Sequence, residues 1–359
     1  MTLRALLIAC LAALALGATT YAYLEARHQA KLERRDRLAK DIPKTVSKPT
    51  IRISSQADVT AKRQSLTRLV WKADVLPKDW PNLRQDRVAA PLRDGLPAAE
   101  VLHIDLPLGM DSRVYYMKQQ SAECLAVYHD GHHAELRAPH ILTRIWESGC
   151  SLLYFSMPLH GGNAIPTIEH PHLGTFRLFS HNLLQLVDLG HFTLLQVFLE
   201  PLVQVLNKVL AERQVDTVLM IGFSGGGWTT AVYAAIDPRI EASVHVAGSL
   251  PLFLHSVPPF SEIGHVEQYY PPLLALVDYT ELYVMAADHG RAQLQILNRY
   301  DPCCFAGEAS TIYAPAVRSA AQNVGGHWDQ WIDATHAAHQ ISPAAVAKVM
   351  EFIRRARLQ

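Results

Sequence analysis

The sequence has few cysteines. Five of its 359 residues are Cys, and they form neither a Cys-x-x-Cys pair nor a Cys/His spacing typical of zinc sites. We therefore predict no metal site, and we expect no cofactor. A disulfide is possible if the domain is exported, but we expect buried free thiols.

An excess of charge of one sign is also missing, since 33 Lys and Arg balance 33 Asp and Glu. The balance hides a basic segment, residues 25–72, which has thirteen Lys and Arg against five Asp and Glu. The remainder is accordingly acidic, which argues against a nucleic-acid partner. The basic segment follows an apolar one, so it suits an anionic membrane surface, although a solvated charged helix fits equally well.

The sequence has one long hydrophobic run near its start, because residues 5–24 contain no charged side chain. Twenty such residues can form a helix that spans a bilayer. We predict a retained membrane anchor at residues 1–24, with a cleavable signal segment as the alternative. The basic flank after the run opposes export, whereas the short N-terminus with one Arg is typical of it. On balance we expect the domain on the periplasmic or extracellular side.

The sequence has no internal repeat, and its hydrophobic pattern changes once, near residue 99. Residues 25–98 are interpreted as a basic helix followed by a proline-containing linker and surface layer. Residues 99–359 are interpreted as one domain, beginning with a β-hairpin. Short apolar runs then alternate with helical segments, as in a mainly parallel sheet with helices on both faces. The runs are 125–128, 151–155, 217–221 and 242–247. An insertion at 163–213 is predicted to be helical from residue 193.

One motif points to chemistry, the segment Gly222-Phe223-Ser224-Gly225-Gly226. An apolar strand precedes it and a helix with small residues follows it. A sharp turn between strand and helix exposes the serine hydroxyl, and the glycines allow the two elements to approach closely. Ser224 is therefore the candidate nucleophile. The following glycines lack the Lys-Ser/Thr pair of a nucleotide-binding P-loop.

The motif and the succession of strands from about residue 101 resemble the α/β-hydrolase superfamily. This resemblance implies an α/β-hydrolase fold and a catalytic triad in the order Ser, acid, His. The His is expected between the last strand and the last helix, which begins at Ser342-Pro343. His339 fits this place best, and His336 is the alternative.

The resemblance also implies an acid at the end of the penultimate strand. Residues 278–281, Asp-Tyr-Thr-Glu, form an acidic variant of a capping box, so the run before Asp288 is predicted to be a helix. Residues 293–297 alternate as a strand and lead to Asp301. We therefore predict Asp301 as the acid and keep Asp288 as the alternative.

The resemblance further implies an oxyanion hole made of backbone N–H groups. Gly225 is expected to supply one, and the loop His129-Asp130-Gly131-His132 the other, from either Gly131 or His132. The predicted activity is hydrolysis of a carboxylic ester or thioester through an acyl-enzyme, on a small-molecule or acylated substrate. A peptidase of the same fold and a non-catalytic binding protein are the alternatives. The sequence predicts no particular oligomeric state.

Overall fold

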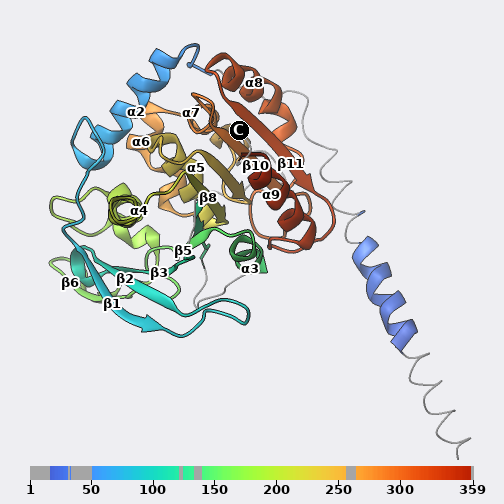
Figure 1. Ribbon diagram of the computed structural model, residues 1–359, viewed down its shortest axis with the longest axis horizontal. Helices are drawn as coiled ribbons and strands as arrows, with labels where there is room; N and C mark the ends of the chain where they lie inside the picture. Colours follow the sequence, from blue (N-terminus) through green and yellow to red (C-terminus); the bar gives the residue numbers. More distant parts are fainter. Residues whose placement is uncertain are drawn as a thin grey trace, which may run out of the picture.

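The computed structural model describes residues 17–30, 33, 51–120, 124–132, 140–255 and 264–356. Their centre is a nine-stranded sheet in the order β1-β2-β3-β5-β4-β8-β9-β10-β11 (Figure 1). The strands are β1 (Leu83–Ala89), β2 (Ala99–Asp105), β3 (Asp111–Met117), β4 (Cys124–His129), β5 (Ser151–Phe155), β8 (Thr217–Phe223), β9 (Ala242–Val246), β10 (Ala292–Asn298) and β11 (His327–Asp333). The first three strands and the β3–β5 pair are antiparallel, and the others are parallel. The predicted mainly parallel sheet and opening hairpin are confirmed.

Helices cover both faces of the sheet, as predicted. They are α2 (Gln56–Trp71), α3 (His140–Glu147), α4 (Leu194–Glu212), α5 (Gly225–Ile236), α6 (Pro271–Leu276), α7 (Tyr279–Met285), α8 (Ser310–Asn323) and α9 (Pro343–Ala356). Along β8, Val218 and Met220 belong to the core beneath α4, α5 and α7, whereas Leu219 and Ile221 belong to the core beneath α3 and α9. This alternation follows from the two-residue period of a strand buried on both faces.

The segment before residue 99 contributes regular structure to the folded body. Helix α2 begins at a capping box in which Ser55 and Asp58 exchange hydrogen bonds with each other's backbone N–H. Its Val59, Leu66 and Val70 side chains are buried in the core. Strand β1 then pairs with β2 and forms the edge of the sheet. The sequence interpretation as linker and surface layer did not foresee these two elements.

Helix α4 occupies the predicted helical part of the insertion. It is the one helix among the described residues that is long and apolar enough to cross a membrane, but 78% of its apolar window is buried inside the protein. It is therefore a core helix. Two of its polar side chains face protein as well, since Glu200 accepts a hydrogen bond from the indole of Trp71 and Gln204 accepts one from the N–H of Asn82.

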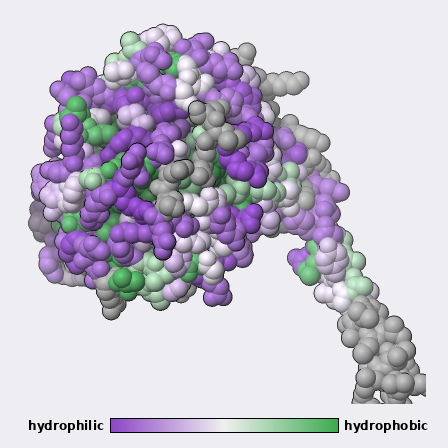
Figure 2. All heavy atoms as spheres, viewed as in Figure 1, coloured by the Kyte–Doolittle hydropathy of each residue, from purple (hydrophilic) through white to green (hydrophobic). Residues whose placement is uncertain are grey.

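The predicted membrane segment lies mostly outside the described residues. Residues 17–30 are helical and largely exposed to solvent, including Tyr21, Tyr23 and Leu24. The visible face of the folded body, by contrast, is covered mainly by hydrophilic residues (Figure 2). The membrane anchor therefore stays a prediction.

Four cysteines form two disulfides, so the expectation of free thiols is wrong for them. Cys124, at the start of β4, is bonded to Cys150, just before β5. Cys303 and Cys304 are bonded to each other although they are adjacent in the chain. The sequence pattern failed here because the first pair is brought together by the pairing of β4 with β5, which spacing alone does not reveal. Cys10 lies outside the described residues.

Candidate active site

Ser224 lies at the sharp turn between the central strand β8 and helix α5. Its backbone has φ 55° and ψ −122°, a conformation that a residue with a side chain rarely adopts. The turn needs glycine on both sides. A Cβ on Gly222 would lie 2.0 Å from the carbonyl oxygen of Gly226, and one on Gly226 would lie 2.1 Å from that of His129. The predicted tight turn is therefore present, and it directs the hydroxyl of Ser224 to the carboxyl edge of the sheet.

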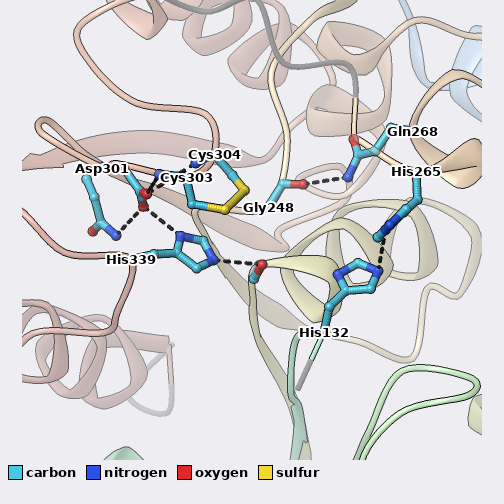
Figure 3. The surroundings of a disulfide bond; sticks show 10 residues. His132, Gly248, His265, Gln268, Asp301, Cys303, Cys304 and His339 are labelled. Carbon is cyan, nitrogen blue, oxygen red and sulfur yellow. Dashed lines mark hydrogen bonds and ion pairs between the residues drawn. A yellow bond between two sulfur atoms is a disulfide. The ribbon is translucent and has the colours of Figure 1, made fainter. Parts of the chain in front are cut away.

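His339 lies between Ser224 and Asp301 and contacts both. Its Nε2 is 2.8 Å from Oγ of Ser224. Its Nδ1 is 2.7 Å from Oδ2 of Asp301 (Figure 3). A carboxylate only accepts, so Nδ1 carries the hydrogen and Nε2 is left to accept the serine proton. The ring of His339 also packs on Phe223, with centroids 4.7 Å apart. The structure thus brings the three predicted residues into one hydrogen-bonded chain.

Asp301 follows the end of β10, and its carboxylate accepts hydrogen bonds from four donors. Its Oδ1 accepts the backbone N–H of Cys303 at 2.8 Å and that of Cys304 at 3.1 Å. Its Oδ2 accepts from the side-chain amide of Asn298 at 3.0 Å, in addition to His339. The same amide group of Asn298 donates to the carbonyl of Gln340, next to His339. Asn298 therefore ties the acid and the histidine loop together, a role that the sequence analysis missed.

The two alternative residues lie in other networks. Asp288 pairs with Arg63 at 2.9 Å and with Arg291, and those two cations lower the pKa of the Asp288 carboxyl although burial alone would raise it. His336 has its Nε2 3.3 Å from Asp333 and accepts the N–H of Ala338 at Nδ1. Neither alternative is brought into contact with Ser224. As predicted, residues 279–285 form a helix, α7, so the strand leading to the acid is β10.

The loop after β4 passes directly over the nucleophile. A Cβ on Gly131 would lie 2.7 Å from Cβ of Ser224, so only glycine fits this approach. The N–H of Gly131 donates to Oδ1 of Asp130 at 2.9 Å, and Oδ2 of Asp130 accepts the hydroxyl of Tyr154 at 2.7 Å. With the N–H of Gly131 engaged, His132 is the better candidate for the second oxyanion donor. Gly225, at the first position of α5, has an N–H without an acceptor in the helix.

Ser224 and His339 open into a cavity of about 400 Å³. Its other walls come from the segment at residues 264–268, the Cys303–Cys304 disulfide, Phe305 and the ring of His132. Figure 3 shows the disulfide beside His339 and the His132–His265 pair across from it. A larger cavity of about 690 Å³, lined by residues such as Arg63, Trp80 and Arg239, shares no residue with this one and contains no nucleophile next to a base. The chemistry therefore assigns the site to the smaller cavity.

A group of histidines at the cavity was not foreseen from the sequence. His181 and Glu267 are fully buried, and His132 and His265 lie beside them. Burial lowers the pKa of His132 to about 3, so the ring is neutral at ordinary pH. For Glu267, burial alone would raise the pKa, but His181 and His132 next to it bring the pKa below its ordinary value. These residues come from three distant parts of the chain, so no spacing in the sequence links them.

Comparison with known proteins places the fold. No family model matches the chain, and no curated protein matches its sequence. Among solved structures, acetyl xylan esterase 1 from Thermoanaerobacterium sp. JW/SL YS485 is similar with a TM-score of 0.56 and 16% identity, over 87% of this chain and 96% of that one. An acetyl xylan esterase from Paenibacillus sp. R4 gives 0.54 and 16%, over 86% and 96%. Methylesterase BT1017 gives 0.54 and 18%, over 95% of this chain and 68% of that one. At such identities the similarity concerns the fold, and this chain has the fold of the α/β-hydrolases.

Proposed function

We propose that the protein is a serine hydrolase that cleaves carboxylic esters through an acyl-enzyme. The observation that carries the proposal is the hydrogen-bonded chain from Oγ of Ser224 through His339 to Asp301, at the wall of a cavity. A neutral hydroxyl is a weak nucleophile, and a base within hydrogen-bond reach activates it. None of the three side chains needs to move for this contact to form.

In the proposed reaction, Ser224 attacks the ester carbonyl while its proton passes to Nε2 of His339. Asp301 stabilises the imidazolium that results and keeps its orientation. The tetrahedral oxyanion accepts hydrogen bonds from the N–H groups of Gly225 and His132. His339 then gives its proton to the alcohol that leaves. A water molecule, activated by the same histidine, attacks the acyl-serine and releases the carboxylic acid.

The cavity favours substrates with a small group at the reacting carbon. About 400 Å³ must hold the acyl group and part of the alcohol, and imidazole rings and Phe305 line it. Two of the similar structures named above are acetyl xylan esterases, which favours a short acyl group, and the third is a methylesterase. A short acyl ester, free or carried on a larger molecule, is therefore the proposed substrate class. A short thioester fits the same chemistry.

We further propose that residues 5–24 anchor this domain at the outer side of a membrane. The Cys124–Cys150 and Cys303–Cys304 bonds favour an oxidising compartment, where disulfides persist. Membranes washed with alkaline carbonate should retain the protein, and a thiol reagent that cannot cross membranes should label it in intact cells only after reduction. Release into the wash, or labelling that requires lysis, would reject the anchor or its orientation respectively.

The activity is tested with a fluorophosphonate probe, which labels activated serines, and with p-nitrophenyl esters. Wild-type protein should be labelled, and it should hydrolyse the acetate ester much faster than the octanoate ester. Ser224→Ala should abolish labelling and lower turnover by about 10⁴-fold or more. Ser148→Ala, at the end of α3, is the matched control and should behave as wild type. Equal labelling of the Ser224→Ala protein would reject the proposed nucleophile, and an unlabelled wild type would favour a non-catalytic binding protein.

A further inference from the structure

Four side chains converge at the far side of the active-site cavity, which three of them line and behind which His181 is buried. The atoms concerned are Nε2 of His132, Nδ1 of His181, Nδ1 of His265 and Oε1 of Glu267, all within 4.8 Å of one another. Nε2 of His132 is 3.2 Å from Nδ1 of His181, 3.1 Å from Nδ1 of His265 and 3.3 Å from Oε1 of Glu267. Nδ1 of His181 is 3.2 Å from the same carboxylate oxygen.

Hydrogen bonds between these groups do not explain the arrangement well. Nε2 of His181 is 2.7 Å from the carbonyl oxygen of Pro158, so this nitrogen carries a hydrogen. In the neutral ring, Nδ1 then carries no hydrogen and directs its lone pair at a carboxylate oxygen. Both atoms are acceptors, so no hydrogen bond joins them. Nε2 of His132 faces three of the converging atoms but carries at most one hydrogen. Oε2 of Glu267 is buried and has no hydrogen-bond partner among the described residues.

We infer that His132, His181, His265 and Glu267 form a binding site for one divalent transition-metal ion, with zinc as the best fit. A tetrahedral ion with bonds of about 2.0–2.1 Å places its ligand atoms about 3.3 Å apart. Four of the six pairs of ligand atoms lie 3.1–3.3 Å apart, and the other two pairs lie within 4.8 Å. Three imidazoles and one carboxylate are donors that suit zinc and its neighbours in the periodic table, rather than calcium or magnesium. The carbonyl of Pro158 holds the outer N–H of His181, as carbonyls commonly do for metal-bound histidines.

The ion would have a positioning role. Four protein ligands fill a tetrahedral shell, which is typical of structural zinc sites, whereas catalytic sites keep a position open. The ligands come from the loop after β4, from the 3₁₀ turn η2 (His181–Gln185) and from the segment at η4 (Val266–Tyr269). An ion there would fasten the His132 loop against two other segments. This loop holds the proposed oxyanion donor, so this consequence depends on the proposed function, whereas metal binding does not.

The test measures metal content in the full chain, without reductant so that Cys303 and Cys304 stay bonded. Wild-type protein should hold about one zinc ion after desalting. After chelation it should take up cobalt(II) with the visible absorption of a tetrahedral site. His265→Gln and Glu267→Gln should weaken zinc binding by at least about 100-fold, because losing a ligand costs more than losing an outer contact. Zinc should also raise the melting temperature of the stripped wild type but not of these variants.

His160→Gln is the matched control. Its ring contacts those of His132 and His181, but its Nδ1 faces the carbonyl of Pro158 and is outside the four converging atoms. It should bind zinc within a few-fold of wild type. The inference is overturned if wild-type protein holds no more zinc than Glu267→Gln, or if His160→Gln loses as much zinc affinity as the two ligand variants. Either result would mean that these residues form only a protonated His–Glu cluster. Probe labelling of Ser224 is recorded in parallel, so the metal site and the proposed function can fail separately.

Discussion

Cys303 donates its backbone N–H to the carboxylate of Asp301 at 2.8 Å, on the oxygen that does not face His339. Cys304 donates to the same oxygen, and a disulfide joins the two cysteines. The bond therefore restrains the peptide units that hold the acid, and one wall of the cavity as well. Its effect should appear in catalysis more than in stability.

Replacing both Cys303 and Cys304 with Ser should lower kcat on a short ester by about tenfold, because the acid loses part of its restraint. The melting temperature should change little, since the bond closes a loop of adjacent residues. The control is Cys124→Ser with Cys150→Ser, which opens a loop of 26 residues and should cost ~3 kcal/mol of unfolding free energy with kcat preserved. Steady-state kinetics and urea unfolding measure the two quantities. The idea fails if the vicinal variant keeps full kcat.

Asp301→Asn should lower kcat by about 10⁴-fold, because an amide cannot stabilise the imidazolium or hold the right tautomer. Asp288→Asn should leave kcat nearly unchanged. It should instead cost about 3 kcal/mol of unfolding free energy, since it leaves the buried guanidinium of Arg291 without its counter-charge. Kinetics and denaturant unfolding of both variants separate the roles. A larger kcat loss in Asp288→Asn would reverse the assignment of the acid.

Gly131→Ala should inactivate the enzyme while the protein stays folded. The added methyl would lie 3.3 Å from Oγ of Ser224, where the substrate carbonyl must approach, and 2.7 Å from its Cβ. We expect turnover to fall by at least about 100-fold, with far-UV circular dichroism unchanged. Gly149→Ala is the control, because a Cβ at Gly149 would meet no atom within 4 Å and the only strain comes from the φ of 86°. Normal turnover in Gly131→Ala would show that the loop retreats from Ser224 in solution.

His245 should make the fold less stable in acid. It is fully buried on β9, stacks on Tyr283 at 5.1 Å, and neither ring nitrogen has a hydrogen-bond partner among the described residues. Burial lowers the pKa of His245 to about 3, below the ordinary 6.5. The unfolded chain thus binds a proton that the folded state does not. The contribution of this group to stability is complete well above pH 6.5 and falls by up to about 1.4 kcal/mol per pH unit below it.

His245→Phe removes that proton site and two unpartnered nitrogens. The unfolding free energy of the variant should therefore fall less steeply than that of wild type between pH 6.5 and pH 5. Urea unfolding at several pH values measures the two slopes. His129, whose pKa burial lowers to about 4, remains in both proteins and contributes equally to each. Parallel slopes would mean that His245 is solvated or paired in solution.

Local patterns accounted for the sheet and for much of the candidate site. The capping box at Asp278 marked α7 as a helix, which left β10 as the strand before the acid. Glycine spacing marked the turn at Ser224. Helix α2 was missed because its stability depends on distant partners, such as the buried Glu281, which accepts from Lys62. The cluster at Glu267 was missed for the same reason, because its members meet only in the folded chain.

The ion pairs of the segment before residue 99 bear on which fragment can fold alone. Arg52 and Lys62 pair with the buried Glu281, and Arg63 pairs with Asp288. A recombinant fragment that began at residue 99 would leave two buried carboxylates short of counter-charges, and β2 would become a bare sheet edge prone to aggregation. The smallest autonomous catalytic unit should therefore start near residue 51. A recombinant fragment without the proposed anchor should therefore begin before that point.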